Sequence, residues 1–144
     1  MQEFVLAFAG SLCAGLLFNV RGNRLLLTGL SGVIGWMVYI WMSGITGSSI
    51  ISIFAGAVAV GVYSETAARL FKSPATVFSI PGIFPIVPGI AAYETIQFLF
   101  SDKLQNAGEK IVETLSGAGA IAFGILLVTA GFRIFSRKRY AERT

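Results

Sequence analysis

The sequence predicts an all-α fold, a polytopic membrane helix bundle of about five transmembrane segments in which the fourth is broken by proline and glycine. Of the 144 residues, 55% are hydrophobic and only 12% are charged. Soluble domains carry roughly a quarter charged residues, so this chain has too few polar side chains to cover a soluble domain of its size. Long apolar stretches recur along the chain, and its four prolines all lie between residues 74 and 88. These observations predict that most of the chain lies in lipid and that the prolines interrupt one of its helices.

Four uninterrupted stretches approach the roughly 20 apolar residues that a helix needs to cross the hydrocarbon layer. They cover residues 4–20, 25–42, 50–66 and 115–135. The third is short, and the polar residues that follow it extend the same helix toward the lipid headgroups. The first carries Glu3 where a secretory signal has basic residues, so we interpret it as a retained span.

The fourth segment, residues 74–100, is apolar but contains all four prolines of the chain. Proline removes a backbone donor and disfavours helical geometry in the residue before it, so a continuous helix is excluded. We expect the break at residues 81–89. The carbonyls freed there need partners from protein or water, so the segment should face the protein interior or a cavity. The chain then forms one membrane domain, residues 1–144.

Basic residues cluster after the first, third and fifth segments. They are Arg21 and Arg24, then Arg69 and Lys72, then Arg133, Arg137, Lys138, Arg139 and Arg143. Residues 43–49 carry no charge, and residues 101–113 carry three acidic and two basic residues, a net charge of −1. The alternation predicts an outside N-terminus and a basic cytoplasmic tail at residues 136–144. A re-entrant fourth segment would break it, so we favour a full but discontinuous span.

Several function classes are not expected from the composition. The net charge of +4 is divided among the ends of apolar segments, which argues against nucleic-acid binding. Histidine is absent and Cys13 is the single cysteine, so no metal site, cofactor or disulfide within the chain is expected. Because no phosphate-binding loop or set of nucleophile and acid is found, we do not expect an enzyme.

Small residues recur four positions apart in nearly every segment. They are Ser11 and Gly15, Thr28 and Gly32, Ser31 and Gly35, Ala55 and Ala59, Ala57 and Gly61, and Ser116, Ala120 and Gly124. Such faces let helix backbones approach closely. They indicate either tight packing within one bundle or assembly with further subunits. We favour assembly, because five helices of this size enclose little space.

The break is the first candidate site, formed by Pro81, Gly82, Pro85, Pro88 and Gly89. Discontinuous helices present backbone groups to substrates in many transporters. A half-helix that begins near Gly89 would direct its N–H groups and positive dipole end into the bilayer, where they favour an anion such as a carboxylate. The alternative is a kinked helix whose prolines only shape packing.

Glu94 is the second candidate. It precedes Asp102 by eight residues, which places it about 12 Å inside the outer boundary at helical rise. An ionisable group at that depth suggests a site, as a proton carrier, a binder of a substrate ammonium or an anchor for a cation on a partner helix. The alternative is a carboxylate nearer the boundary. Asn19, at the end of the first segment, is a helix cap or part of the inner gate.

Residues 68–89 resemble the signature of the threonine/serine exporter family. The similarity lies in the patterns ARxxxxPATVF and IPGIxPxVPG, and Leu17-Phe18-Asn19-Val20 resembles an early motif of the same family. The resemblance implies a small five-span subunit that acts with a larger partner, which has a soluble cytoplasmic portion and five spans of its own. It places the five residues of the break in the transport path, and Asn19, Arg69 and Pro74 at the cytoplasmic entrance.

The resemblance also implies a function and a location. The expected function is export of threonine and serine, or of a dicarboxylate such as succinate, driven by the membrane potential or a proton gradient. The expected location is the inner (cytoplasmic) membrane of a prokaryote. Two alternatives stay open, a non-transporting scaffold subunit and a homo-oligomeric channel.

Overall fold

The computed structural model describes residues 2–141, and within them it contains helices and no strands. The helices are α1 (Gln2–Leu17), α2 (Asn23–Thr46), α3 (Ser49–Leu70), α4 (Thr76–Ile83), the 3-10 helix η1 (Phe84–Ile86), α5 (Gly89–Phe100) and α6 (Leu104–Ala141). The predicted all-α class is therefore confirmed. The predicted tail at 136–144 continues α6 to Ala141, and residues 142–144 lie outside the described residues.

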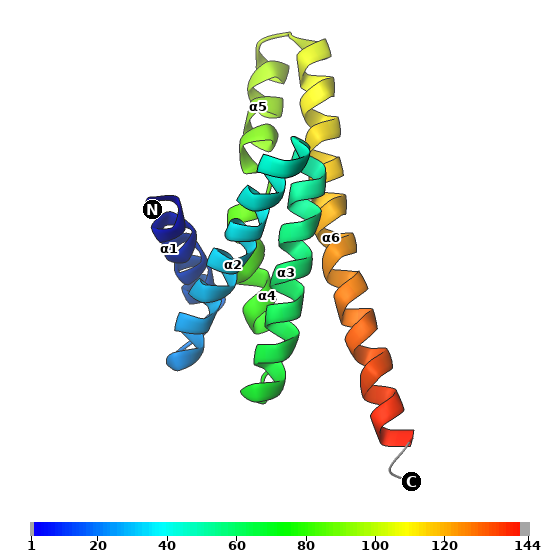
Figure 1. Ribbon diagram of the computed structural model, residues 1–144. Helices are drawn as coiled ribbons and strands as arrows, with labels where there is room; N and C mark the ends of the chain where they lie inside the picture. Colours follow the sequence, from blue (N-terminus) through cyan, green and yellow to red (C-terminus); the bar gives the residue numbers. More distant parts are fainter. Residues whose placement is uncertain (1, 142–144) are drawn as a thin grey trace.

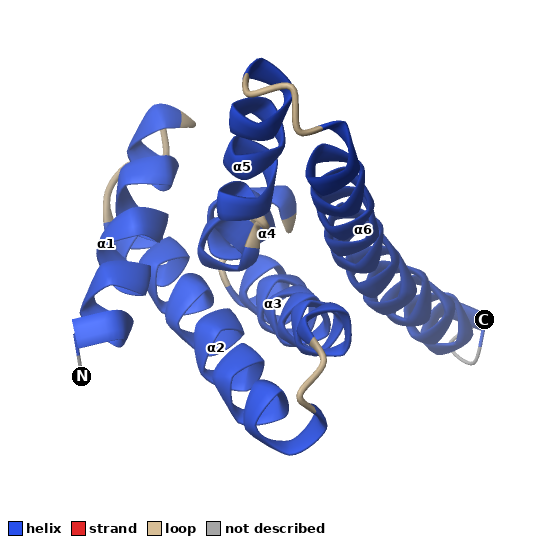
Figure 2. Ribbon diagram, turned by 90° about the horizontal axis from the view of Figure 1, so that it is seen from above, coloured by secondary structure: helices blue, strands red, loops and turns tan. Residues whose placement is uncertain are grey.

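The antiparallel pair α2 and α3 forms the centre of the bundle (Figure 1). Helix α1 packs against α2, α6 packs against α3, and α4 lies against both central helices. Seen from above, α1 and α6 stand on opposite sides of this centre (Figure 2). We call the end with the α1–α2 and α3–α4 connections the basic end, because it carries Arg21, Arg24, Arg69 and Lys72. The other end, with the α2–α3 and α5–α6 connections, is the far end.

Among residues 2–141, three helices are long and apolar enough to cross a membrane: α2, α3 and α6 up to Ile134. The bent pair of Thr76–Ile86 and Gly89–Phe100 makes a fourth if it counts as one span. Helix α1 has 16 residues, which at 1.5 Å per residue extend about 24 Å, less than the hydrocarbon layer of about 30 Å. It ends early because Asn19 has a positive φ of 58°. The structure thus contains three to four candidate spans, and the count of five stays a prediction.

The fourth segment leaves helical geometry toward the end of the range 81–89. Pro81 and Gly82 lie inside α4, and the chain leaves helical geometry at Val87, which is extended with ψ of 133°. The residue before a proline avoids the α region, so Pro88 explains this conformation. The helices before and after the interruption are bent by 56°. Since this angle is well below a right angle, both continue toward the far end (Figure 1).

Helix α6 begins at Leu104, well before the predicted start at residue 115. Residues 104–114 were expected to be a polar connection, yet they are rich in helix-forming residues and pack along α5. Helix α5 lies mainly against α6, and the two form a hairpin that extends past the α2–α3 turn (Figure 1). The sequence did not predict a helix over residues 104–114, because hydropathy detects an apolar span and not the polar helix that extends it.

Small residues form the contacts between the central helices. Added side chains on Gly82 of α4 and on Gly32 of α2 would collide with Ser31 and Ser11, respectively. A Cβ atom on Gly124 of α6 would lie 3.0 Å from the Cβ of Ala57 on α3. Most of the predicted small-residue faces are therefore used for packing within this chain, the simpler of the two interpretations.

Candidate functional site

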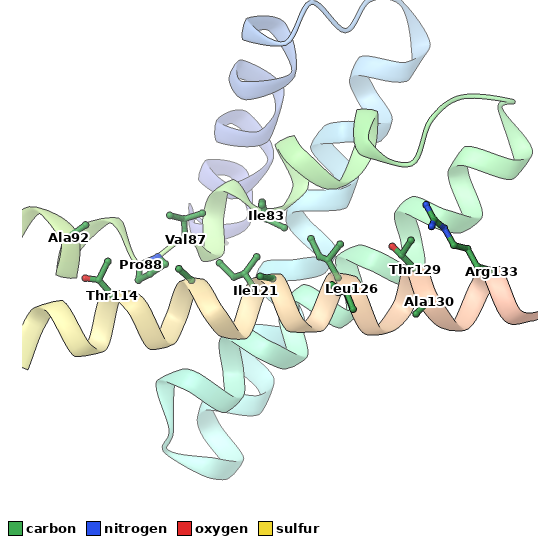
Figure 3. Close-up of a pocket in the computed structure, with 13 residues that line it drawn as sticks. Ile83, Val87, Pro88, Ala92, Thr114, Ile121, Leu126, Thr129, Ala130 and Arg133 are labelled. Atoms are coloured by element: carbon green, nitrogen blue, oxygen red, sulfur yellow. The ribbon is translucent and has the colours of Figure 1, made fainter.

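A lateral groove of about 870 Å³ lies between the broken segment and α6 (Figure 3). The broken segment contributes Ile83, Val87, Pro88 and Ala92, and α6 contributes Thr114, Ala118, Ile121, Ala122, Ile125, Leu126, Thr129, Ala130 and Arg133. The lining is apolar apart from the two threonines and Arg133. It follows one side of α6 because residues three and four apart share a helix face. The groove is open along one side, so the chain alone does not enclose it.

The lateral groove continues into a polar pocket at the basic end. This basic-end pocket has a volume of about 800 Å³ and shares Ile125, Thr129 and Arg133 with the groove. Its other lining residues come from the end of α3 and the start of the broken segment: Glu65, Ala68, Arg69, Ser73, Pro74, Ala75, Thr76 and Ser79. Together the two cavities form one path from the level of Pro88 to the charged end of the bundle.

Arg69 is held in the basic-end pocket by α6. Its Nη2 donates a hydrogen bond to the carbonyl oxygen of Phe132 at 3.2 Å, and its guanidinium lies 4.8 Å from the centre of the Phe132 ring. A cation in the last turn of α3 is also stabilised by the helix dipole. Pro74 lies beside it because Lys72, with φ of 49°, turns the chain back after α3. The structure thus brings Arg69 and Pro74 together.

Asn19 is not part of this pocket. It lies at the α1–α2 turn, where its Oδ1 accepts a hydrogen bond from Nε of Arg21 at 3.0 Å. Its left-handed backbone, φ of 58°, suits asparagine better than most residues. The side chain is exposed and lines neither the groove nor the basic-end pocket. The contacts of Asn19 are those of a turn residue.

The five residues predicted at the break occupy different surroundings. Pro81 and Gly82 are buried in α4, where Gly82 contacts Ser31. Pro88 lines the lateral groove, and Gly89 lines a pocket at the far end. Pro85 lines that pocket and another against α1. Helix α5 begins without a side-chain cap, and its first N–H group, that of Gly89, donates to the carbonyl of Val87 at 2.7 Å.

The far-end pocket, of about 340 Å³, lies between the break, α2 and α6. Trp36 and Tyr39 of α2 line it with their rings stacked, the centroids 5.1 Å apart. The indole Nε1 of Trp36 is buried and has no hydrogen-bond partner among the described residues. Ser49, at the start of α3, lines the same pocket together with Glu94. Glu94 therefore lies at the level of the α2–α3 turn, at the end of the central pair.

Glu94 forms an ion pair that the sequence did not reveal. Nζ of Lys110 lies 2.9 Å from Oε2 of Glu94 and 2.9 Å from Oε2 of Glu113. The side chains of Glu94 and Lys110 are each about one-third exposed (34% and 32%), so water screens their attraction in part. Of the three roles predicted for Glu94, only anchoring to a cation has a described contact, and that cation belongs to α6 of the same chain. A predicted last helix that began at Leu104 rather than at residue 115 would have placed Lys110 and Glu113 three residues apart on one helix face, where they can pair.

Sequence patterns did not single out Thr129 and Arg133 as site residues, and they predicted Glu65 only as a structural ion-pair partner of Arg69, four residues further on. Arg133 was treated only as a charge at the membrane boundary. Thr129 and Arg133 are four residues apart and point to the same side of α6 (Figure 3). Ala122 and Leu126 continue the same face at a spacing of three to four residues. This spacing was the signal in the sequence that could have placed Thr129 and Arg133 on the groove. Among residues 2–141, no cluster of three potential metal ligands was found.

Long apolar helices, a broken segment and a groove that leads from the break to the basic end define the class of protein, a helical membrane protein. A family model described as "Threonine/Serine exporter, ThrE" matches residues 3–130. The chain therefore belongs to the threonine/serine exporter family, as the motif in residues 68–89 indicated. No curated protein and no solved structure gives a significant match.

Proposed function

We propose that this chain is a subunit of a secondary transporter that exports small carboxylate-bearing metabolites, threonine and serine first and a dicarboxylate such as succinate second. The continuous path formed by the lateral groove and the basic-end pocket carries this proposal. Its apolar part excludes water, and its charged end attracts a polar solute from that side. Pro88 marks the inner end of the groove, because it ends the first half of the broken segment and its ring packs against Gly117 of α6.

The proposal includes a larger partner subunit with a soluble cytoplasmic portion and five spans. The lateral groove is open on one side, and a transport path across lipid needs protein on all sides. A second copy of this chain is the alternative cover.

We also propose an arrangement in the membrane. The basic end faces the cytoplasm of a prokaryotic cell, in agreement with the positive-inside rule. Helices α4 and α5 together make one crossing, since the 56° bend carries the chain onward rather than back. With α1 as a short first span, the N-terminus lies outside and residues 136–144 lie in the cytoplasm.

Reconstitution tests the proposal. Proteoliposomes that contain this chain and its larger partner should release labelled threonine and serine, and vesicles with either subunit alone should release neither above background. Labelled succinate in parallel vesicles measures the second substrate class. Lack of release from the complete complex under an imposed potential or proton gradient would contradict the transport role. Steady conductance by this chain alone in a planar bilayer would favour a homo-oligomeric channel.

A scaffold role is the second candidate, and the burial of Pro81 and Gly82 favours it. Both motif residues are buried in α4 and pack against neighbouring helices, which is what a motif with a purely structural role requires. A scaffold predicts that substitutions lining the groove leave efflux unchanged as long as the complex assembles. The two roles therefore differ in a measurable result, the efflux of groove variants.

Glu94 provides a prediction at the far end. The variant Glu94→Gln should lower threonine efflux several-fold, because it removes the ion pair that joins α5 to Lys110 of α6 and so loosens the two helices that continue into the walls of the groove. A charge swap, Glu94→Lys with Lys110→Glu, should restore part of the activity if the ion pair is what matters. Initial efflux rates and recovery of the assembled complex are the measurements. Unchanged efflux and assembly in Glu94→Gln would remove Glu94 from the path.

A further inference from the structure

We propose that the basic-end pocket is the site that receives the substrate, and that it binds the zwitterionic group of a free α-amino acid. Glu65 binds the ammonium group, and Arg133 binds the carboxylate beside Arg69. This inference rests on the proposed transport function and names the substrate class within it. It selects an amino acid over a dicarboxylate.

The charges in the basic-end pocket match a zwitterion. Glu65 is half-buried on α3, and Arg69 follows it by one helical turn. Arg133 reaches the same pocket from α6. A ligand with one positive and one negative group can satisfy both kinds of side chain, whereas a second carboxylate would be repelled by Glu65. A partly desolvated acid discriminates in this way more strongly than one in bulk water, because the local dielectric constant is lower.

Arg133 occupies the junction between pocket and groove. It lines both, and Thr129 accompanies it one turn away on the same side of α6 (Figure 3). A guanidinium binds a carboxylate through two parallel hydrogen bonds, which fixes the orientation of the ligand as well as its position. Phe132 holds the guanidinium of Arg69 close to α6, so the second cation is already positioned. A carboxylate bound at Arg133 is directed toward the groove.

Hydroxyl groups complete the pocket. Thr76 and Ser79 come from α4, and Thr129 comes from α6. These side chains both donate and accept hydrogen bonds, so they suit a substrate that carries a hydroxyl group of its own. The volume of about 800 Å³ lies within the ordinary range of roughly 300–1,000 Å³ for small-molecule sites. The pocket therefore has polar partners for each part of a small hydroxyamino acid.

The test uses inverted membrane vesicles that contain the assembled two-subunit complex and labelled threonine in the medium. Four unlabelled competitors define the ligand: serine, threoninamide, N-acetylthreonine and succinate. In the unmodified complex only serine should compete well, because the others lack one of the two charges. Competition by succinate as strong as that by serine would overturn the inference.

Variants then assign the two charges. Glu65→Gln should reduce threonine uptake at least about tenfold and make N-acetylthreonine a relatively better competitor, since its missing ammonium no longer matters. Arg133→Gln should reduce uptake similarly and favour threoninamide instead. Glu109→Gln and Lys103→Gln remove one charge of each sign at the far end, outside the pocket, and should leave uptake unchanged. The opposite changes in competitor preference cannot result from misfolding, which lowers uptake without altering preference.

Failure of this inference is separable from failure of the proposed function. If the unmodified complex transports threonine, but Glu65→Gln keeps the original order of competitors, the pocket assignment is wrong and transport stands. If the unmodified complex moves neither threonine nor serine, the transport role itself is overturned. Glu65→Asp keeps the charge and should retain the preference for serine over N-acetylthreonine.

Discussion

The variant Ala122→Trp is expected to abolish threonine and serine efflux while the complex still assembles. Ala122 is exposed on α6 and lines the lateral groove, so an indole there occupies the proposed path without displacing a packed core residue. The initial rate of efflux should fall at least about tenfold, because the indole fills the groove through which the substrate would pass. Efflux from proteoliposomes, normalised to assembled complex, measures it.

Leu127 provides the matched control. It is 49% exposed on α6 but does not line the groove. The variant Leu127→Trp adds the same side chain to the same helix, and its efflux should stay within about twofold of the unmodified complex. Equal efflux from both variants at equal assembly would contradict a path through the groove and support the scaffold role.

Removing the break should have an effect of similar size. The double variant Pro88→Ala with Gly89→Ala restores an N–H donor and frees Val87 from the constraint that a following proline imposes. Residues 86–90 can then become helical, which reduces the 56° bend and moves the wall of the groove. We expect efflux to fall at least about tenfold, because the wall of the groove has moved. Insertion into the membrane should be retained, because the two alanines are apolar residues that favour a helix.

Gly108→Ala is the control for this double variant. Gly108 lies in α6, where an added Cβ atom meets nothing within 4 Å, so the substitution should leave efflux unchanged. The change in bend can be followed by distances between spin labels on α4 and α5. A straightened segment with full efflux would show that the break serves packing alone.

Much of the fold follows from local patterns. Residues 25–42 and 50–66 were predicted as spans, and α2 and α3 contain both of them. The break was expected around residues 81–89, and the chain leaves its helix at Val87 within that range. These results rest on hydropathy and on proline geometry, which act within one segment. The polar start of α6 was missed because hydropathy detects apolar spans and not the polar helix that extends one.

The candidate site was predictable only in part. Arg69 and Pro74 line one pocket, and their place at a cytoplasmic entrance stays a prediction. Glu94 was placed by counting residues back from Asp102, which assumes that α5 lies within the span. The structure places Glu94 beside Ser49 and pairs it with Lys110, contacts that counting along one helix does not reveal. The depth of Glu94 in the membrane stays a prediction.

By itself, the sequence determined that this protein is helical, that lipid surrounds it, that one segment is interrupted and that its motif belongs to an exporter family. Composition, segment length and proline spacing are sufficient for that, because each acts locally. Only the tertiary structure decided that Gly82 packs against α2 while Pro88 faces a groove, and that Glu65 and Arg133 share one pocket. These relations depend on how each helix is rotated and how far it is shifted against its neighbours, which contacts between distant residues determine.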